Sequence, residues 1–250
     1  MIAGGIYVRD IATIPYFSFR ELLVTPASQR RVVLRVMSQQ IIFAGVGALP
    51  MITIVALLLG SVMLIHVHTI GSKNPLGTMM AMVLIRELGP LLTAFVVIGR
   101  SGVAICTELG NLRVGNQIKA LHTMGIRVLG FVVLPRMLAV VVAMICLTIY
   151  FDLIAVMGGF TVAKFVLGES IFVFLYILEQ SVSLTDVLIT VIKGGIFGFA
   201  VAAICCHHGL LVKHSAPEVP QATTQAILSS VIVCVLLDLL LIVILRVFFA

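Results

Sequence analysis

Charge is scarce in this sequence. Lys, Arg, Asp and Glu make up 10% of the 250 residues, and hydrophobic residues make up 61%. An average soluble domain is about 25% charged. A chain with so few charges could not keep its surface hydrated, so lipid must be the solvent for much of it. The composition therefore predicts a membrane protein and excludes a soluble globular domain.

The excess of basic residues does not indicate a nucleic-acid partner. The net charge is +6, but the basic residues lie between long apolar runs. This arrangement is typical of a charge bias toward the cytoplasmic side of a membrane protein, not of a groove that follows a polynucleotide. We expect no nucleic acid to bind.

The motifs of catalysis and metal binding are also missing. No GxxxxGK[ST] phosphate loop occurs, and the segment 71–73 (GSK) lacks the upstream glycine that such a loop requires. No Ser, His and carboxylate set is spaced as a catalytic triad. The five cysteines lie in or beside apolar stretches without CxxC spacing, as small buried residues do. We expect no enzymatic activity, no cofactor and no metal site.

The first 37 residues do not resemble a signal peptide, because charged residues and aromatics are mixed throughout them. Within this region, residues 6–24 carry tyrosines and phenylalanines between charges. That pattern predicts an amphipathic helix lying in the membrane interface, interrupted by Pro15 and Pro26.

Five stretches are apolar and long enough to cross about 30 Å of hydrocarbon, which takes about 20 helical residues. Each must be helical, because unpaired backbone groups are too costly in lipid. The predicted spans are residues 40–67, 78–99, 128–151, 187–206 and 226–249. Residues 160–185 are apolar but interrupted by charges, and we expect a partly helical excursion there. The fold class is thus an all-α polytopic membrane protein.

The loops give an orientation. With the N-terminus inside, most basic residues outside the spans lie on the cytoplasmic side, as the positive-inside rule requires. Five spans then place the C-terminus on the outer side. No repeat or low-complexity linker divides the chain, so residues 1–250 form a single domain.

Four charges inside the predicted spans are the strongest sign of function. Arg86 and Glu87 lie near the centre of the second span, Lys193 in the fourth and Asp238 in the fifth. Each costs about 2.5–3.5 kcal/mol or more at a helix centre. They either form ion pairs that lock helices together or make a polar patch in a cavity.

Two further features concern helix shape and contact. Pro50 and Gly60 predict a loosened or kinked first span. Gly194 and Gly198 form a small-xxx-small step beside Lys193, which predicts a close approach of another helix.

The segment 104–126, between the second and third spans, contains a short amphipathic helix. Ile118, Leu121 and Met124 recur at helical spacing, with polar residues between them. Periodicity alone leaves two alternatives open: the apolar ridge lies on lipid, or it inserts into a groove of a soluble partner.

A series of short motifs carries a family resemblance. They are LIRELGP at 84–90, GRSG at 99–102, ELG at 108–110, QIKAL at 117–121, MG at 124–125, LPR at 134–136, ATT at 222–224 and LD at 237–238. In this order they resemble the MlaE/YrbE permease family, densely over residues 40–140 and sparsely over the remainder.

The resemblance implies a function and a set of partners. Such permeases are membrane subunits of ABC-type lipid transporters in the bacterial inner membrane, and they move phospholipid or related lipids. It implies a homodimer, two copies of an ABC ATPase and an MCE-domain protein on the outer face. It leaves open whether a small regulator binds the ATPase. A rival from another class is a proton-coupled secondary transporter that works without an ATPase.

The resemblance also implies residue roles. Arg86, Glu87 and Lys193 match polar positions of the lipid-binding cavity, and Leu59 matches an apolar one. The helix after the second span matches the coupling helix that contacts the ATPase. The residues that match this ATPase-coupling segment are Glu108, Gln117, Ile118, Leu121, Met124 and Gly125. The segment departs from many relatives, which are acidic where this chain has Asn116 and Lys119.

Overall fold

The computed structural model describes residues 37–70, 84–125, 128–165, 184–212, 215 and 217–249. Nearly all of these residues are helical, and none of them lies in a strand. Five helices are long and apolar enough to cross a membrane: Met37–His66, Arg86–Val114, Leu129–Val162, Thr185–Leu211 and Glu218–Ile244. The predicted all-α fold with five spans is confirmed. The predicted interfacial helix and most of the predicted excursion lie outside the described residues.

The second span is longer at its C-terminal end than the sequence predicted. It runs without a break through η2 (Leu84–Leu88), α5 (Gly89–Val97), η3 (Ile98–Gly102) and α6 (Val103–Val114). The predicted end at residue 99 was therefore wrong. The helix continues past the charges because one of its faces stays apolar: Ile105, Cys106 and Leu109 are buried in the core.

Three further predictions about the spans need correction. Arg86 and Glu87 lie near the N-terminal end of the described part of the second span, which continues to Val114, and not near its centre. The third helix, α8 (Leu134–Phe165), extends well beyond residue 151, and α10 (Leu184–Leu211) begins before residue 187. The described ends of the predicted excursion are therefore parts of these two long helices.

Prolines account for most of the irregular helical turns. The 3-10 turn η1 (Val46–Ala48) precedes Pro50, and the π-helical turns η2 and η4 (Leu129–Val133) precede Pro90 and Pro135. Proline has no N–H to donate to the carbonyl four residues earlier, so the regular ladder is interrupted just before it. The prediction of a loosened helix at Pro50 is confirmed, whereas α3 (Leu49–Ile70) continues through Gly60 without interruption.

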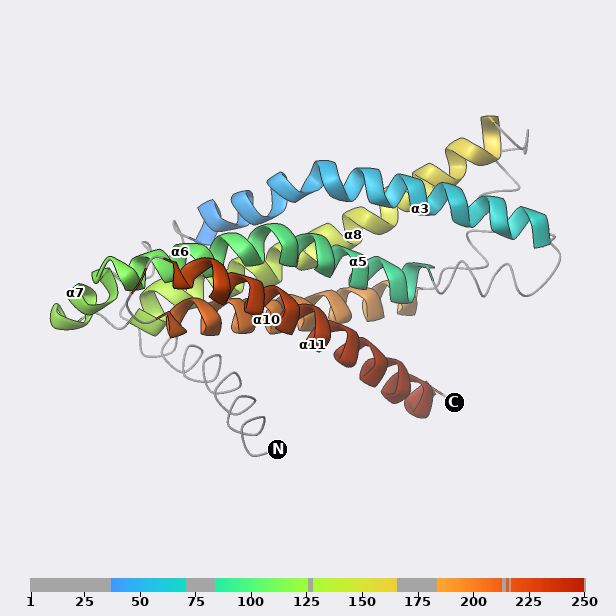
Figure 1. Cartoon of the computed structure of the whole chain (residues 1–250). Coiled ribbons are helices and arrows are strands. Elements are labelled where there is room, and N and C mark those ends of the chain that lie inside the picture. The colour runs from blue at the N-terminus through green and yellow to red at the C-terminus, as the bar shows by residue number, and fades with distance from the viewer. Residues whose placement is uncertain are drawn as a thin grey trace.

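The helix α10 is the centre of the bundle. It packs against α8, α6 and α5 and against α11 (Glu218–Phe249), while α3 packs mainly along α8 (Figure 1). Glycines set the closest contacts. A Cβ on Gly194 would lie 2.8 Å from Thr148 Oγ1, and one on Gly198 would lie 2.9 Å from Met144 Cβ. The close approach predicted for this glycine pair is confirmed, and its partner is α8.

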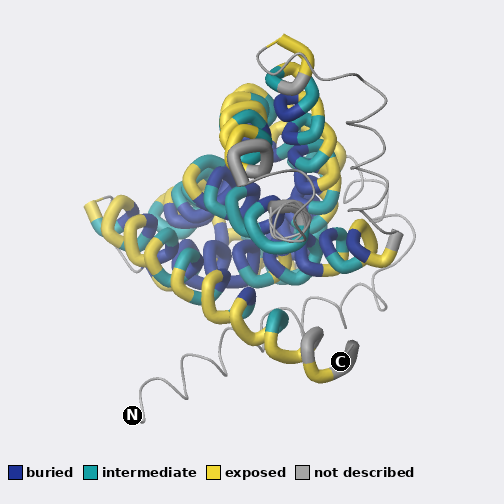
Figure 2. Tube along the Cα trace, turned by 90° about the vertical axis from the view of Figure 1, so that its right-hand side faces the viewer, coloured by how far each residue is buried: buried dark blue, intermediate teal, exposed yellow. Residues whose placement is uncertain are grey.

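The outer helices present apolar side chains to the surroundings. On α3 and α11, large hydrophobic residues such as Leu58, Leu236 and Val243 are exposed, and Figure 2 shows these exposed faces in yellow on the outside of the bundle. An apolar surface of this extent is unstable in water and is suited to contact with lipid or with another membrane helix.

Candidate functional site

Lys193 on α10 is the centre of a buried ion-pair network. Its Nζ donates a hydrogen bond to Glu87 Oε2 on η2 and lies 3.1 Å from Asp238 Oδ1 on α11. The Lys193 side chain is only 1% exposed, and that of Asp238 is 9% exposed. One ammonium therefore joins three helices that are distant in the sequence. Ion pairing was one of the two alternatives left open for the charges inside the spans, and these three residues do form ion pairs.

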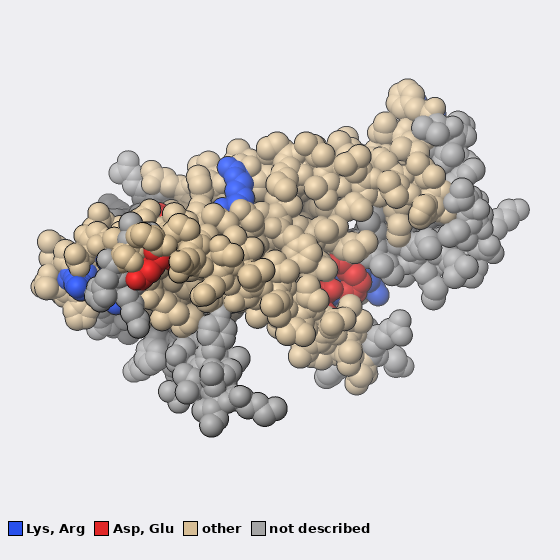
Figure 3. Space-filling view, viewed as in Figure 1, with Lys and Arg blue, Asp and Glu red and all other residues tan. Residues whose placement is uncertain are grey.

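Arg86 belongs to a second pair beside the first. Its guanidinium donates to Asp186 Oδ1 at the start of α10, and the Asp186 side chain is buried. Arg86 and Glu87 are adjacent in η2, so this single π-helical turn supplies a residue to each pair. π-Helical turns recur at functional sites because they redirect side chains that a regular helix would place elsewhere. Figure 3 shows acidic and basic atoms gathered together at this end of the bundle.

The five charges do not balance, and they differ in access. Two cations, Arg86 and Lys193, face three carboxylates, Glu87, Asp186 and Asp238, which leaves a formal charge of −1. The Arg86 side chain is 38% exposed and that of Glu87 is 25% exposed. A ligand that reaches this network from outside therefore meets Arg86 and Glu87 first, whereas Lys193 is enclosed.

Sequence reasoning missed two acidic residues here. Asp186 stands before the predicted start of the fourth span, and Asp152 just after the predicted end of the third. Asp152 Oδ1 is buried and has no hydrogen-bond partner among the described residues. Its spacing of one helical turn from Thr148, which packs against α10, is the signal that could have drawn attention to it.

A further ion pair lies toward the opposite end of the bundle. Arg136 at the start of α8 donates from Nη2 to Glu108 Oε1 (2.6 Å) and from Nε to Glu108 Oε2 (3.3 Å). Its Nη1 donates to the carbonyl of Val132 at 2.7 Å. Arg136 is 7% exposed. Glu108 thus lies within the long second helix, and its ion pair with Arg136 joins this helix to the third span.

The short helix α7 (Gln117–Thr123) follows the second span. Its ends are set by two residues with positive φ, Asn116 (56°) and Gly125 (73°), a conformation that asparagine and glycine tolerate best. Ile118 is 6% exposed and Leu121 is half-buried, and both face the body of the protein, whereas Met124 is 74% exposed. The predicted apolar ridge is therefore split: Ile118 and Leu121 pack on the bundle, and Met124 is exposed.

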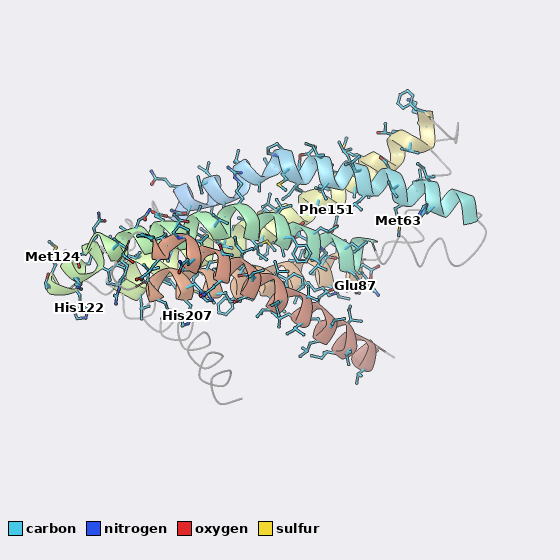
Figure 4. All side chains as sticks on the ribbon, in the orientation of Figure 1. Met63, Glu87, His122, Met124, Phe151 and His207 are labelled. Atoms are coloured by element: carbon cyan, nitrogen blue, oxygen red, sulfur yellow. The ribbon has the colours of Figure 1, made fainter. Side chains whose placement is uncertain are left out.

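The ion-pair network around Lys193 and the short helix α7 lie toward opposite ends of the molecule. Figure 4 places Glu87 near one end of the bundle and His122 and Met124 at the other. The continuous helix from Glu87 to Val114 spans about 40 Å at 1.5 Å per residue. Leu59, on α3, packs against the hydrophobic core alongside α8 and is not among the residues that the ion pairs bring together.

These observations define a class: a multi-pass membrane protein with ion pairs buried in its helix bundle and a short exposed helix at one end. Residues 37–244 match the family described as "Permease MlaE". The chain therefore belongs to the MlaE permease family.

Relatives include two described as a "Probable ABC transporter permease protein". The Rickettsia bellii protein is 32% identical over 77% of this chain and 76% of its own length. The Rickettsia typhi protein is 29% identical over 90% of this chain and 87% of its own. The Haemophilus influenzae "Intermembrane phospholipid transport system permease protein MlaE" is 29% identical over 94% of this chain and 91% of its own.

Proposed function

We propose that this chain is the membrane-spanning subunit of an ABC-type transporter that moves phospholipid between the inner membrane and an MCE-domain protein on its outer face. It works as a homodimer with two ATPase subunits. The observation that carries the proposal is the single helix that joins the Glu87 ion-pair network at one end to α7 at the other. The name of the Haemophilus influenzae relative, an intermembrane phospholipid transport permease, supports phospholipid as the cargo.

The lipid site is proposed at the exposed edge of the ion-pair network. Arg86 is the best-placed cation for a phosphate headgroup, because its guanidinium is 38% exposed and can bind phosphate through two hydrogen bonds. Glu87 lies beside it, and Leu59 supplies apolar surface for an acyl chain. Lys193 acts from beneath, where it fixes Glu87 and Asp238.

The ATPase contact is proposed at α7. Gln117, Met124 and Gly125 are exposed and form the contact surface, while Ile118 and Leu121 hold α7 on the bundle. Glu108 and Arg136 brace α6 against α8, so a displacement of α7 reaches both helices. An ATPase contact at α7 requires this helix to lie in the cytoplasm, and the proposal therefore has the N-terminus inside and the C-terminus in the periplasm.

The proposal is tested by purifying the tagged chain gently from native membranes and identifying all bound proteins and lipids by mass spectrometry. We expect an ABC ATPase, an MCE-domain protein and phospholipid, and any small regulator would be found in the same sample. A chain that purifies alone and transports lipid under a proton gradient without ATP would reject the proposal. That result would favour the secondary transporter, with Glu87 or Asp238 carrying the proton.

Met124→Asp is expected to abolish the stimulation of ATP hydrolysis by lipid while the permease remains folded. An ionised carboxylate at this 74% exposed position would need desolvation if it entered an apolar groove of the ATPase. The measurement is ATP hydrolysis by the reconstituted complex with and without phospholipid. Met124→Leu, which keeps an apolar side chain, is the matched control and should retain stimulation. Equal stimulation in both variants would remove Met124 from the contact.

A further inference from the structure

Arg100 is a cation without a carboxylate partner inside the membrane-spanning part of the chain. It lies in the π-helical turn η3 of the second span. Arg86, Arg136 and Lys193 each face a carboxylate, whereas no described carboxylate pairs with Arg100. Its Nη1 is buried and has no hydrogen-bond partner among the described residues. An arginine in a span is costly unless an anion or hydrogen-bond acceptors neutralise its guanidinium.

The surface that receives this side chain is shaped to fit it. Arg100 projects from the π-helical turn η3 onto the start of the first span, where a Cβ on Gly47 would overlap the guanidinium. The Phe43 ring lies 5.7 Å from Arg100 Cζ, within range of a cation–π interaction. Glycine at position 47 thus makes the space that the guanidinium occupies. Figure 3 shows that the side of the molecule on which α3 lies is almost uncharged apart from one isolated basic patch.

The site lies toward the end of the membrane-spanning bundle at which α7 lies. Phe43 and Gly47 stand near the start of the described part of the first span, and that start is on the α7 side of the bundle (Figure 1). Lipid phosphate groups lie at the two edges of a membrane, outside about 30 Å of hydrocarbon. A cation near this end of the bundle is therefore suited to meet the phosphate groups of the leaflet on the α7 side.

We propose that Arg100, Phe43 and Gly47 form a binding site for the phosphate group of a membrane phospholipid in the leaflet on the α7 side. Besides the buried Nη1, the guanidinium carries donors on Nε and Nη2, and these two match two phosphate oxygens in a planar arrangement. Ile42, Phe43 and Val46 are 61%, 51% and 57% exposed beside it and offer apolar surface to the acyl chains. This site is separate from the Glu87 network and does not depend on ATPase coupling.

A carboxylate from a second copy of the chain is the competing occupant, and the two carboxylates described at this end of the bundle argue against it. Glu108 is held by Arg136, and Glu218 Oε1 accepts a hydrogen bond from Ser215. Neither carboxylate is free to neutralise Arg100 of another copy without losing a partner of its own.

The experiment uses a phospholipid with a photoactivatable headgroup, reconstituted with the purified full-length chain in nanodiscs. Mass spectrometry maps the labelled peptides. We expect labelling of the segment around Phe43 to fall about tenfold in Arg100→Gln and in Gly47→Ala. The second variant keeps the charge but displaces the guanidinium. Gly45→Ala is the matched control, because a Cβ there has no neighbour within 4 Å, and it should label as the unmodified chain does.

The results of this experiment distinguish three possible partners of Arg100: a membrane phospholipid, a free phosphate ion and a second copy of the chain. Unchanged labelling in both variants would overturn the proposal. Full competition by millimolar inorganic phosphate would assign the site to a free anion and would reject a lipid. Dissociation of a dimer in Arg100→Gln, seen by native mass spectrometry, together with unchanged labelling, would assign Arg100 to the contact between copies. Loss of labelling confined to the Phe43 segment, with labelling near Glu87 retained, would support the proposal even if the transport function proposed above were wrong.

Discussion

Lys193→Met is expected to lower the free energy of unfolding by about 3–5 kcal/mol, because it leaves two carboxylates in the bundle without their cation. Glu87 and Asp238 both bind the Lys193 ammonium, whose side chain is 1% exposed. Without it they repel each other across a medium of low dielectric constant. The sequence contains no tryptophan, so we would follow unfolding in detergent by circular dichroism during titration with dodecyl sulfate.

The control replaces the whole network at once, as Glu87→Gln, Lys193→Met and Asp238→Asn in one chain. Substituting a buried ion network by neutral groups of similar size is often close to neutral for stability, so most of the loss should be recovered, to within about 1 kcal/mol. Wild-type stability in the single variant would show that the ion pairs do not form in the membrane.

The same variants distinguish two roles for the buried charges, one in the transport cycle and one in holding the helices together. If the neutral triple variant is folded but transports no lipid, the charges act in the transport cycle. If it is folded and transports normally, the ion pairs only hold η2, α10 and α11 together. Arg86 is intact in this chain, so its contact with a headgroup is tested independently of helix packing.

The membrane architecture was predictable because it depends on local composition. Apolar runs of about 20 residues must be helical in lipid, and the cost of intramembrane charge drew attention to Glu87, Lys193 and Asp238. Their pairing was one of the alternatives considered. The pairing of Arg86 with Asp186 was not predictable, since these residues are 100 positions apart and meet only through the packing of η2 against α10.

The helix ends were the weakest part of the prediction. A drop in hydropathy at Arg100 suggested the end of a span, but a helix inside a bundle needs only one apolar face, and Ile105 and Leu109 provide it. The same ambiguity affects α7. The spacing of Ile118, Leu121 and Met124 indicated an apolar ridge, but only tertiary contacts show that Ile118 faces the bundle while Met124 is exposed.

Gly60→Ala is expected to destabilise the protein by about 3 kcal/mol, the upper part of the usual range for overpacking. A Cβ at this position would overlap the backbone carbonyl of Ala155 on α8. Backbone cannot move aside as the end of a flexible side chain can. The neighbouring contact is also close, since a Cβ on Gly158 would lie 2.7 Å from the carbonyl oxygen of Leu57. The substitution must therefore separate α3 from α8.

The comparison with Gly45→Ala isolates this steric effect from helix propensity. Both glycines lie in the first span, but a Cβ on Gly45 has no neighbour within 4 Å. Alanine favours a helix by about 1 kcal/mol over glycine, so Gly45→Ala should be neutral or stabilising. The same dodecyl sulfate titration measures both variants. If Gly60→Ala is as stable as Gly45→Ala, α3 and α8 are farther apart in the membrane than their glycines indicate. That result would support the prediction of a kink at Gly60, because helix flexibility and not close packing would then explain the glycine.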